Sequence, residues 1–307
     1  MTHLRVGTRS SLLARTQTRQ VMDDVAMLFP GLTWSEHLVS TAGDLSDAPL
    51  STLTTPGIFI SALRDELLRN NVDVIVHSMK DLPALPHPGI SLAAIPTRED
   101  PRDTLICSVA DSLDALPLGA RVGTSSPRRE ASLRRLRPDL QVAPIRGNIT
   151  TRLEKVARGD YDATILAKAG LIRAGLTDAI AQELDLTEFL PAPRQGALAV
   201  ECRREDLDTF AFLSALDDHD SRVSATAEQA VLIGLAAGCH VAIGAHARWA
   251  NDELMLHAEL GLARTGEAVN VRRSVDVNST LEDAHALGLS VAEALQEFPL
   301  SAEALDQ

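Results

Sequence analysis

Arginines cluster in one stretch of this 307-residue chain. Between Arg121 and Arg173 there are 12 Lys or Arg and 5 Asp or Glu, a local net charge of +7 in a chain whose formal net charge is −13. Two motifs, G-T-S-S-P-R-R at 123–129 and R-G-N-I-T-T-R at 146–152, carry four of these arginines. Guanidinium groups pair well with planar carboxylates. The stretch therefore predicts a site for a small polyanionic ligand.

Each of these motifs is expected where a strand ends and a helix begins. Ser125 or Ser126 can cap a helix that starts at Pro127, and Asn148 can cap the next helix. The free N–H groups and the positive dipole end of a helix start attract carboxylate or phosphate. The arginines beside these starts are therefore candidate anion ligands: Arg128, Arg129, Arg146 and Arg152. The alternative is a solvated basic helix face, which is our interpretation of three further arginines: Arg134, Arg135 and Arg137.

A second polar group follows the apolar run V-D-V-I-V-H-S-M at 72–79, which has the pattern of a central parallel strand. Open α/β sheets hold ligands just beyond the carboxyl ends of such strands, where Lys80 and Asp81 stand. Neighbours on an extended segment point to opposite sides, so one would bind and the other would move protons or stabilise positive charge. The alternative is an ordinary strand-end ion pair. Asp100 and Asp103 are interpreted as turn and capping residues.

The three cysteines are widely spaced. Cys239 stands in G-C-H-V-A-I-G at 238–244, where a thiol beside His240 can be reactive; the alternative is a buried structural cysteine. Cys107 and Cys202 lie within apolar strands and are expected to be structural. An odd count without C-x-x-C argues for a reducing compartment and against a zinc site, so no metal is expected.

Composition excludes several other classes. The acidic balance and an aromatic content of 3% argue against a nucleic-acid binder, which needs positive charge and stacking platforms. No run reaches about 18 apolar residues, so no membrane span is expected. The start, M-T-H-L-R-V-G-T-R-S, lacks the apolar run of a signal peptide. A cytoplasmic protein without nucleic-acid or membrane partners is therefore predicted.

The pattern along the chain predicts three domains. V-G-T-R-S-S at 6–11 repeats the strand–Thr/Ser–helix pattern of 122–129, which suggests two similar α/β halves. The polar segment 42–57 is expected to be a lid loop. From Val241 onward the residues alternate like antiparallel strands. We predict an α/β domain of residues 1–97 plus 196–216, an arginine-rich α/β domain of 98–195, and an acidic α+β domain of 217–307.

Eight ordered motifs resemble the porphobilinogen deaminase (hydroxymethylbilane synthase) family over essentially the whole chain. They are V-G-T-R-S-S at 6–11, H-S-M-K-D-L-P at 77–83, E-D-P-R-D at 99–103, G-T-S-S-P-R-R at 123–129, R-G-N-I-T-T-R at 146–152, A-K-A-G-L-I-R at 167–173, Q-G-A-L-A-V-E-C-R at 195–203 and G-C-H-V-A-I-G at 238–244. The fold implied is two periplasmic-binding-protein-like α/β domains plus a C-terminal α+β domain with a small antiparallel sheet.

The resemblance implies a transferase that joins four porphobilinogen molecules head to tail with release of ammonia, giving hydroxymethylbilane for tetrapyrrole (haem) biosynthesis. It implies one covalent dipyrromethane cofactor, bound through a thioether to Cys239 as primer, and Asp81 as the main catalytic group. Cofactor-binding residues implied are Lys80, Asp81, Thr124, Ser126, Arg128, Arg129 and Arg146. Substrate-binding residues implied are Arg9, Ser11, Phe59, Arg146, Arg152, Arg173 and Gln195. A monomer is expected.

The chain departs from the family pattern at two places. Many members carry lysines near the positions of Thr52 and Pro56, and His240 and Ala242 replace the usual types after the cysteine. The competing hypothesis is a non-catalytic two-lobed protein that binds a small anion reversibly and carries no cofactor. A further alternative is a relative that keeps the cofactor but elongates slowly.

Overall fold

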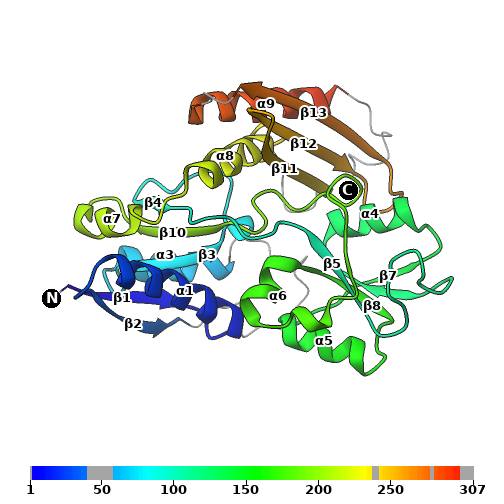
Figure 1. Ribbon diagram of the computed structural model, residues 1–307, viewed down its shortest axis with the longest axis horizontal. Coiled ribbons are helices and arrows are strands. Elements are labelled where there is room, and N and C mark those ends of the chain that lie inside the picture. The colour runs from blue at the N-terminus through cyan, green and yellow to red at the C-terminus, as the bar shows by residue number, and fades with distance from the viewer. Residues whose placement is uncertain (1, 40–57, 237–241, 277–279, 298–307) are drawn as a thin grey trace. The chain divides into compact units, whose positions relative to one another are not determined.

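The computed structural model describes residues 2–39, 58–236, 242–276 and 280–297 (Figure 1). Cys239 and the predicted lid at 42–57 lie outside these residues. Within them the chain divides into two compact units, residues 1–99 with 197–222 and residues 100–196 with 223–307. The C-terminal residues thus fall in the same unit as the arginine-rich segment. The three-domain partition stays a prediction.

The first unit is built on a five-stranded sheet of order β2-β1-β3-β10-β4. The strands are β1 (His3–Thr8), β2 (Thr33–Leu38), β3 (Val74–Ser78), β4 (Ile90–Ala94) and β10 (Leu198–Arg203). β1, β2 and β3 are parallel, and β10 runs antiparallel between β3 and β4. The helices are α1 (Leu12–Leu28), α3 (Ile58–Leu68) and α7 (Leu207–Ser214).

Helices cover both faces of this sheet. Val74 and Val76 of β3 pack in one core with Val21 and Val25 of α1, whereas Ile75 packs in another core with residues of α3. Because successive side chains of a strand point to opposite faces, α1 and α3 lie on opposite sides. Burial on both faces explains the continuous apolar run of β3, which the sequence shows as a central parallel strand.

The second unit contains a sheet of order β7-β6-β8-β5-β9. Its strands are β5 (Asp103–Cys107), β6 (Arg121–Gly123), β7 (Gln141–Ala143), β8 (Ala163–Ala167) and β9 (Gln182–Glu183), and its helices are α4 (Pro127–Leu136), α5 (Ile149–Ala157) and α6 (Lys168–Ala174). β6, β7 and β8 are parallel, and β5 runs antiparallel between β8 and β9. Both sheets thus share one pattern of strand directions, although along the chain the antiparallel strand comes last in the first sheet and first in the second. This shared pattern confirms the two similar α/β halves.

The same unit contains a three-stranded antiparallel sheet of β11 (Ala242–Ala250), β12 (Glu253–Gly261) and β13 (Ala268–Asp276) (Figure 1). Its core joins α8 (His219–Gly234) and α9 (Leu281–Gln296) through residues such as Val231, Leu256 and Val291. This layer confirms the predicted α+β part with a small antiparallel sheet. In the described part of the chain, no helix is both long and apolar enough to cross a membrane.

Candidate active site

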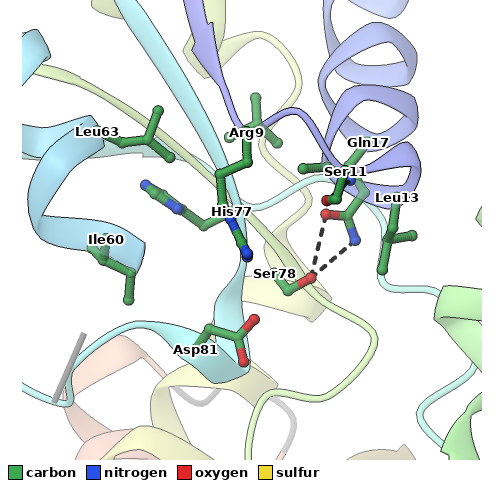
Figure 2. Close-up of a pocket in the computed structure, with 11 residues that line it drawn as sticks. Arg9, Ser11, Leu13, Gln17, Ile60, Leu63, His77, Ser78 and Asp81 are labelled. Atoms are coloured by element: carbon green, nitrogen blue, oxygen red, sulfur yellow. Dashed lines mark hydrogen bonds between the residues drawn. The ribbon is translucent and has the colours of Figure 1, made fainter. Parts of the chain in front are cut away.

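A pocket of about 90 Å³ lies at the carboxyl ends of β1 and β3 in the first unit (Figure 2). Ser11 caps α1 by accepting a hydrogen bond from the Ala14 N–H at 3.4 Å, so the helix start faces the same edge as the end of β3. The pocket is lined by Arg9, Ser11, Leu13, Ala14, Gln17, Ile60, Leu63, Val76, His77, Ser78 and Asp81. The structure therefore brings together three predicted site residues: Arg9, Ser11 and Asp81.

The backbone at Lys80 and Asp81 differs from the extended segment that the sequence predicts. β3 ends at Ser78, and Met79–Asp81 form a 3₁₀ turn, so the argument from alternating sides is wrong here. Met79 is buried, and its N–H donates to the Ala197 carbonyl at 2.9 Å, which fixes the turn at the end of the strand. The turn presents the exposed carboxylate of Asp81 to the pocket.

Two pocket residues, Gln17 and His77, are not among the site residues predicted from the sequence. Gln17 is buried on α1 and donates from Nε2 to the Ser78 hydroxyl at 2.9 Å, which joins the helix to the end of β3 (Figure 2). Gln17 follows Ser11 by six residues, which is not a same-face helical spacing, so no sequence pattern singles it out. His77 is also buried, with Nε2 3.5 Å from a Glu201 oxygen. His77 belongs to the quoted H-S-M-K-D motif.

Glu201 anchors the wall behind this pocket. Its carboxylate accepts two hydrogen bonds from Arg64, one from Nε at 3.1 Å and one from a terminal nitrogen at 2.5 Å. Burial alone would raise the pKa of Glu201, but His77 and Arg64 outweigh it and lower the pKa to about 2. Glu201 is therefore a buried anion at neutral pH, and it lies beside the ring of His77 at the back of the pocket.

The second unit has its own polar edge, at the carboxyl ends of β6 and β7. Ser126 is the N-cap of α4, with its hydroxyl accepting the Arg129 N–H, and Pro127 is the first helical residue. Asn148 is the N-cap of α5, accepting the Thr151 N–H at 2.9 Å. Both predicted helix starts are confirmed. Buried Thr124 accepts the Ser126 N–H at 3.1 Å, which shapes the turn before α4.

Arg128 and Arg129 are buried rather than solvated, which excludes the exposed basic face for this pair. One terminal nitrogen of each guanidinium donates to Asp103, at 2.6 Å from Arg128 and 2.8 Å from Arg129. Their other terminal nitrogens donate to the carbonyls of Leu190 and Ile165. Asp103 is fully buried, so its interpretation as a turn residue is wrong.

Arg152 adds a third positive charge to this edge. Its Nε donates to the Gly147 carbonyl at 2.9 Å. Burial, and then the positive charge of Arg129, lower the pKa of Arg152 to about 10. The Nε atoms of Arg128 and Arg129 are buried and have no hydrogen-bond partner in the described part of the chain. Two guanidiniums share one internal carboxylate, and Arg152 lies near Arg129. This arrangement leaves positive charge and donors for an acidic ligand, so these residues fit a cofactor that carries carboxylates.

The remaining predicted site residues lie at different places. Arg173 of α6 donates to the Gly196 carbonyl at 2.7 Å, and Gln195 is buried and donates to Asp103 at 2.9 Å. Arg146 lies in the loop after β7, immediately before Gly147. Phe59 belongs to the first turn of α3, and its side chain is outside the described part.

The three arginines interpreted as a solvated face have separate contacts. Arg134 pairs with Glu130 one turn earlier at 2.8 Å, as a surface helix pair does. Arg135 pairs at 3.0 Å with Glu259 of β12. Arg137 is largely buried, and it donates to Asp139 and to three carbonyl groups. The solvated interpretation is therefore wrong for Arg137.

Comparisons with known proteins agree over almost the whole chain. Residues 4–211 match the family model described as "Porphobilinogen deaminase, dipyromethane cofactor binding domain", and residues 223–297 match "Porphobilinogen deaminase, C-terminal domain". The chain is 44% identical over 296 residues to the porphobilinogen deaminase of Xanthomonas axonopodis pv. citri (strain 306), covering 96% of each chain. It is 44% identical to that of Thermobifida fusca (strain YX), covering 96% of this chain and 94% of the relative.

Among solved structures, a periplasmic substrate-binding protein of an ABC transporter from Coxiella burnetii covers 74% of this chain and 96% of its own, with 17% identity and a TM-score of 0.44. The family assignment rests on the two family models and on the relatives that match over almost their full length. The chain belongs to the porphobilinogen deaminase family.

Proposed function

We propose that this chain is a hydroxymethylbilane synthase, a transferase that condenses four porphobilinogen molecules head to tail with loss of ammonia. The observation that carries the proposal is the surplus of buried positive charge around Asp103 in the second unit. Such a site suits ligands with several carboxylates, and each porphobilinogen ring carries an acetate and a propionate. The carboxylate of Asp81, in the pocket of the first unit, supplies the chemistry.

The proposed work of Asp81 follows from its charge and exposure. When the aminomethyl nitrogen of porphobilinogen leaves as ammonia, the ring system becomes a cation. The Asp81 carboxylate accepts a hydrogen bond from the pyrrole N–H and stabilises that positive charge. It can also hold the proton that is released as the new carbon–carbon bond forms, and general acid–base help of this kind contributes typically about 10²–10⁴-fold.

The proposed cofactor is a dipyrromethane joined to Cys239 by a thioether. When bound, it supplies the free pyrrole carbon to which the first substrate is joined. The residues proposed to hold it are Lys80, Asp81, Thr124, Ser126, Arg128, Arg129 and Arg146. Those proposed to hold substrate or the growing chain are Arg9, Ser11, Phe59, Arg146, Arg152, Arg173 and Gln195. The proposal includes a cytoplasmic monomer, as the sequence predicts.

The mass of the denatured, purified protein tests this function. We expect an excess equal to two linked pyrrole units, located on the peptide that contains Cys239, and consumption of added porphobilinogen with release of ammonia. A protein with the bare mass of its sequence, which gains no mass and consumes no porphobilinogen on incubation, contradicts the proposal. That result indicates instead the non-catalytic protein that binds a small anion reversibly.

A further inference from the structure

The carboxylate of Asp103 is the centre of a buried network in the second unit. Asp103 has no exposed surface. Its Oδ2 accepts from Arg128 at 2.6 Å, and its Oδ1 accepts from Arg129 at 2.8 Å and from the Gln195 amide at 2.9 Å. Three separate motifs of the sequence therefore meet at the Asp103 side chain. The proposed mechanism gives Asp103 itself no role.

The strand order explains how these residues meet. Asp103 is the first residue of β5, and because β5 is antiparallel it lies beside Ala167, the last residue of β8. Asp103 is therefore at the carboxyl edge of the parallel strands, where α4 begins with its two arginines. The Gln195 amide also donates to the Pro101 carbonyl at 2.8 Å, which ties the segment before β5 to the network.

A buried ion cluster of this kind is poor evidence for stability as such. Removing two arginines and a carboxylate from water costs several kcal/mol per ion in typical proteins, and apolar residues can replace such clusters without loss. The cluster also has an imbalance, since one carboxylate faces two guanidiniums, whose Nε donors have no partner in the described part of the chain. An arrangement built for stability alone would satisfy these donors.

The network also extends to the sheet that follows the cofactor cysteine in the sequence. Arg128 donates to the Leu190 carbonyl, and the next residue, Pro191, accepts the Ala245 N–H of β11 at 3.0 Å. Gly244 packs so closely on Leu190 that an added Cβ would be 2.7 Å from the Leu190 Cβ. The Arg128 guanidinium is thus held by Asp103 through one terminal nitrogen and, through the other, by the segment that accepts the N–H of β11.

We propose that Asp103 is a positioning residue, which orients Arg128 and Arg129 so that their remaining donors receive the carboxylates of the pyrrole ligand. The two arginines against one carboxylate leave one positive charge, and Arg152 near Arg129 adds a second. Two positive charges match the acetate and propionate of one ring. This inference rests on the proposed function, because that function supplies the ligand.

Two variants test the role, with a matched control. Asp103→Glu keeps the charge and moves the carboxylate by one methylene, and Asp103→Asn removes the charge. Displacement of binding groups by about 1 Å can cost up to ~100-fold, so we expect KM for porphobilinogen to rise about 10- to 100-fold in Asp103→Glu. We also expect fewer molecules with the dipyrromethane mass. Asp100→Asn, three residues earlier, loses a partly exposed partner of Arg102 and Lys168 that, among the described residues, makes no hydrogen bond or ion pair with Arg128 or Arg129, and it should change KM less than about fivefold.

The readouts separate positioning from a merely structural role. A structural role lowers the melting temperature and the folded fraction but leaves the KM of the folded enzyme and its cofactor mass unchanged, and that result overturns the inference. Wild-type KM and cofactor mass in Asp103→Glu overturn it as well. If Asp103→Asn does not fold, because two buried arginines lose their counter-ion, Asp103→Glu decides by the same readouts.

If the proposed function itself is wrong, the wild-type protein has only the mass of its amino-acid sequence and consumes no porphobilinogen. The same variants, titrated with porphobilinogen by calorimetry, still decide the inference: a dissociation constant raised about 10-fold or more in Asp103→Glu supports it, as displacement of the binding groups requires. An unchanged constant overturns it.

Discussion

Asp81 is the residue whose chemistry is most directly exposed to a ligand, because its carboxylate lines the pocket. In Asp81→Asn the amide keeps the size but can neither hold a proton nor balance a cation. We expect kcat to fall about 10²–10⁴-fold, measured as porphobilinogen consumption, with the dipyrromethane mass retained. Asp23→Asn, on the exposed side of α1, is the control and should turn over like wild type. A fall of less than about tenfold in Asp81→Asn would show that another group does this work.

Glu201 gives a pH-dependent prediction at the same scale. Its pKa in the fold is about 2, against an ordinary value of 4.5. Its contribution to the free energy of unfolding is therefore fully present above pH 4.5 and is lost as the pH falls through about 2. Glu201→Gln leaves Arg64 and His77 without this anion, and we expect a cost of about 3 kcal/mol near pH 7.

Urea unfolding of both proteins measures this cost. The gap between wild type and Glu201→Gln should narrow by about 1.4 kcal/mol from about pH 7 to about pH 3.5, because the unfolded chain binds a proton at this carboxylate below about pH 4.5 while the folded protein does not. Glu130→Gln loses a partly exposed helix pair with Arg134 and should cost less than about 1 kcal/mol. A gap for Glu201→Gln that does not change with pH would contradict the assigned pKa.

Gly147 sets the turn between β7 and α5. Its φ of +107° favours glycine, and an added Cβ would be 2.6 Å from Cγ2 of Thr151, whose N–H holds the Asn148 cap. We expect Gly147→Ala to cost about 2–4 kcal/mol from strain plus overpacking, and to raise KM because Arg152 is hydrogen-bonded to this residue. Thermal unfolding and initial rates measure the two effects.

Gly159, just after α5, is the matched control. It also has a positive φ, +79°, but no atom would lie within 4 Å of its added Cβ. Gly159→Ala should therefore cost only the conformational strain, about 1 kcal/mol, and leave KM unchanged. Equal losses of stability and equal KM values for the two substitutions would mean that the close contact with Thr151 adds nothing to the cost of Gly147→Ala.

At the scale of elements, the sequence predicts the helix starts well because their signals are local. Ser126, Pro127 and Asn148 each favour their position by their own chemistry. The partners of Asp103 could not be predicted in this way. They depend on β5 running antiparallel beside β8, and no pattern near residue 103 encodes that neighbour. The 3₁₀ turn at Lys80 was missed because an apolar run does not specify where extended backbone ends.

At the scale of the whole molecule, the repeated strand–Thr/Ser–helix pattern was a reliable guide. Both five-stranded sheets have the same pattern of strand directions, and each has its polar residues where parallel strands end. The packing of the three-stranded sheet on α4 was less predictable. It depends on the close approach of Gly261 to Ala131 and on the pair of Arg135 with Glu259, and both contacts join residues more than 120 positions apart. Alternation in the strands predicts that a sheet exists but not which helix covers it.

The charge distribution gives the last prediction. The chain has a net charge of −13, while the segment from Arg121 to Arg173 has a net charge of +7, so the ligand must reach a local positive field on an acidic protein. Salt screens such fields, and the Debye length falls from ~20 Å at about 20 mM to ~4 Å at about 500 mM. We therefore expect KM for porphobilinogen to rise severalfold over this range of sodium chloride, with kcat little changed. Arg152→Gln should flatten this dependence, whereas Arg158→Gln, exposed at the far end of α5 and paired with Asp160, should preserve it. A KM that does not respond to salt in wild type would mean that the arginines act by shape and hydrogen bonding alone.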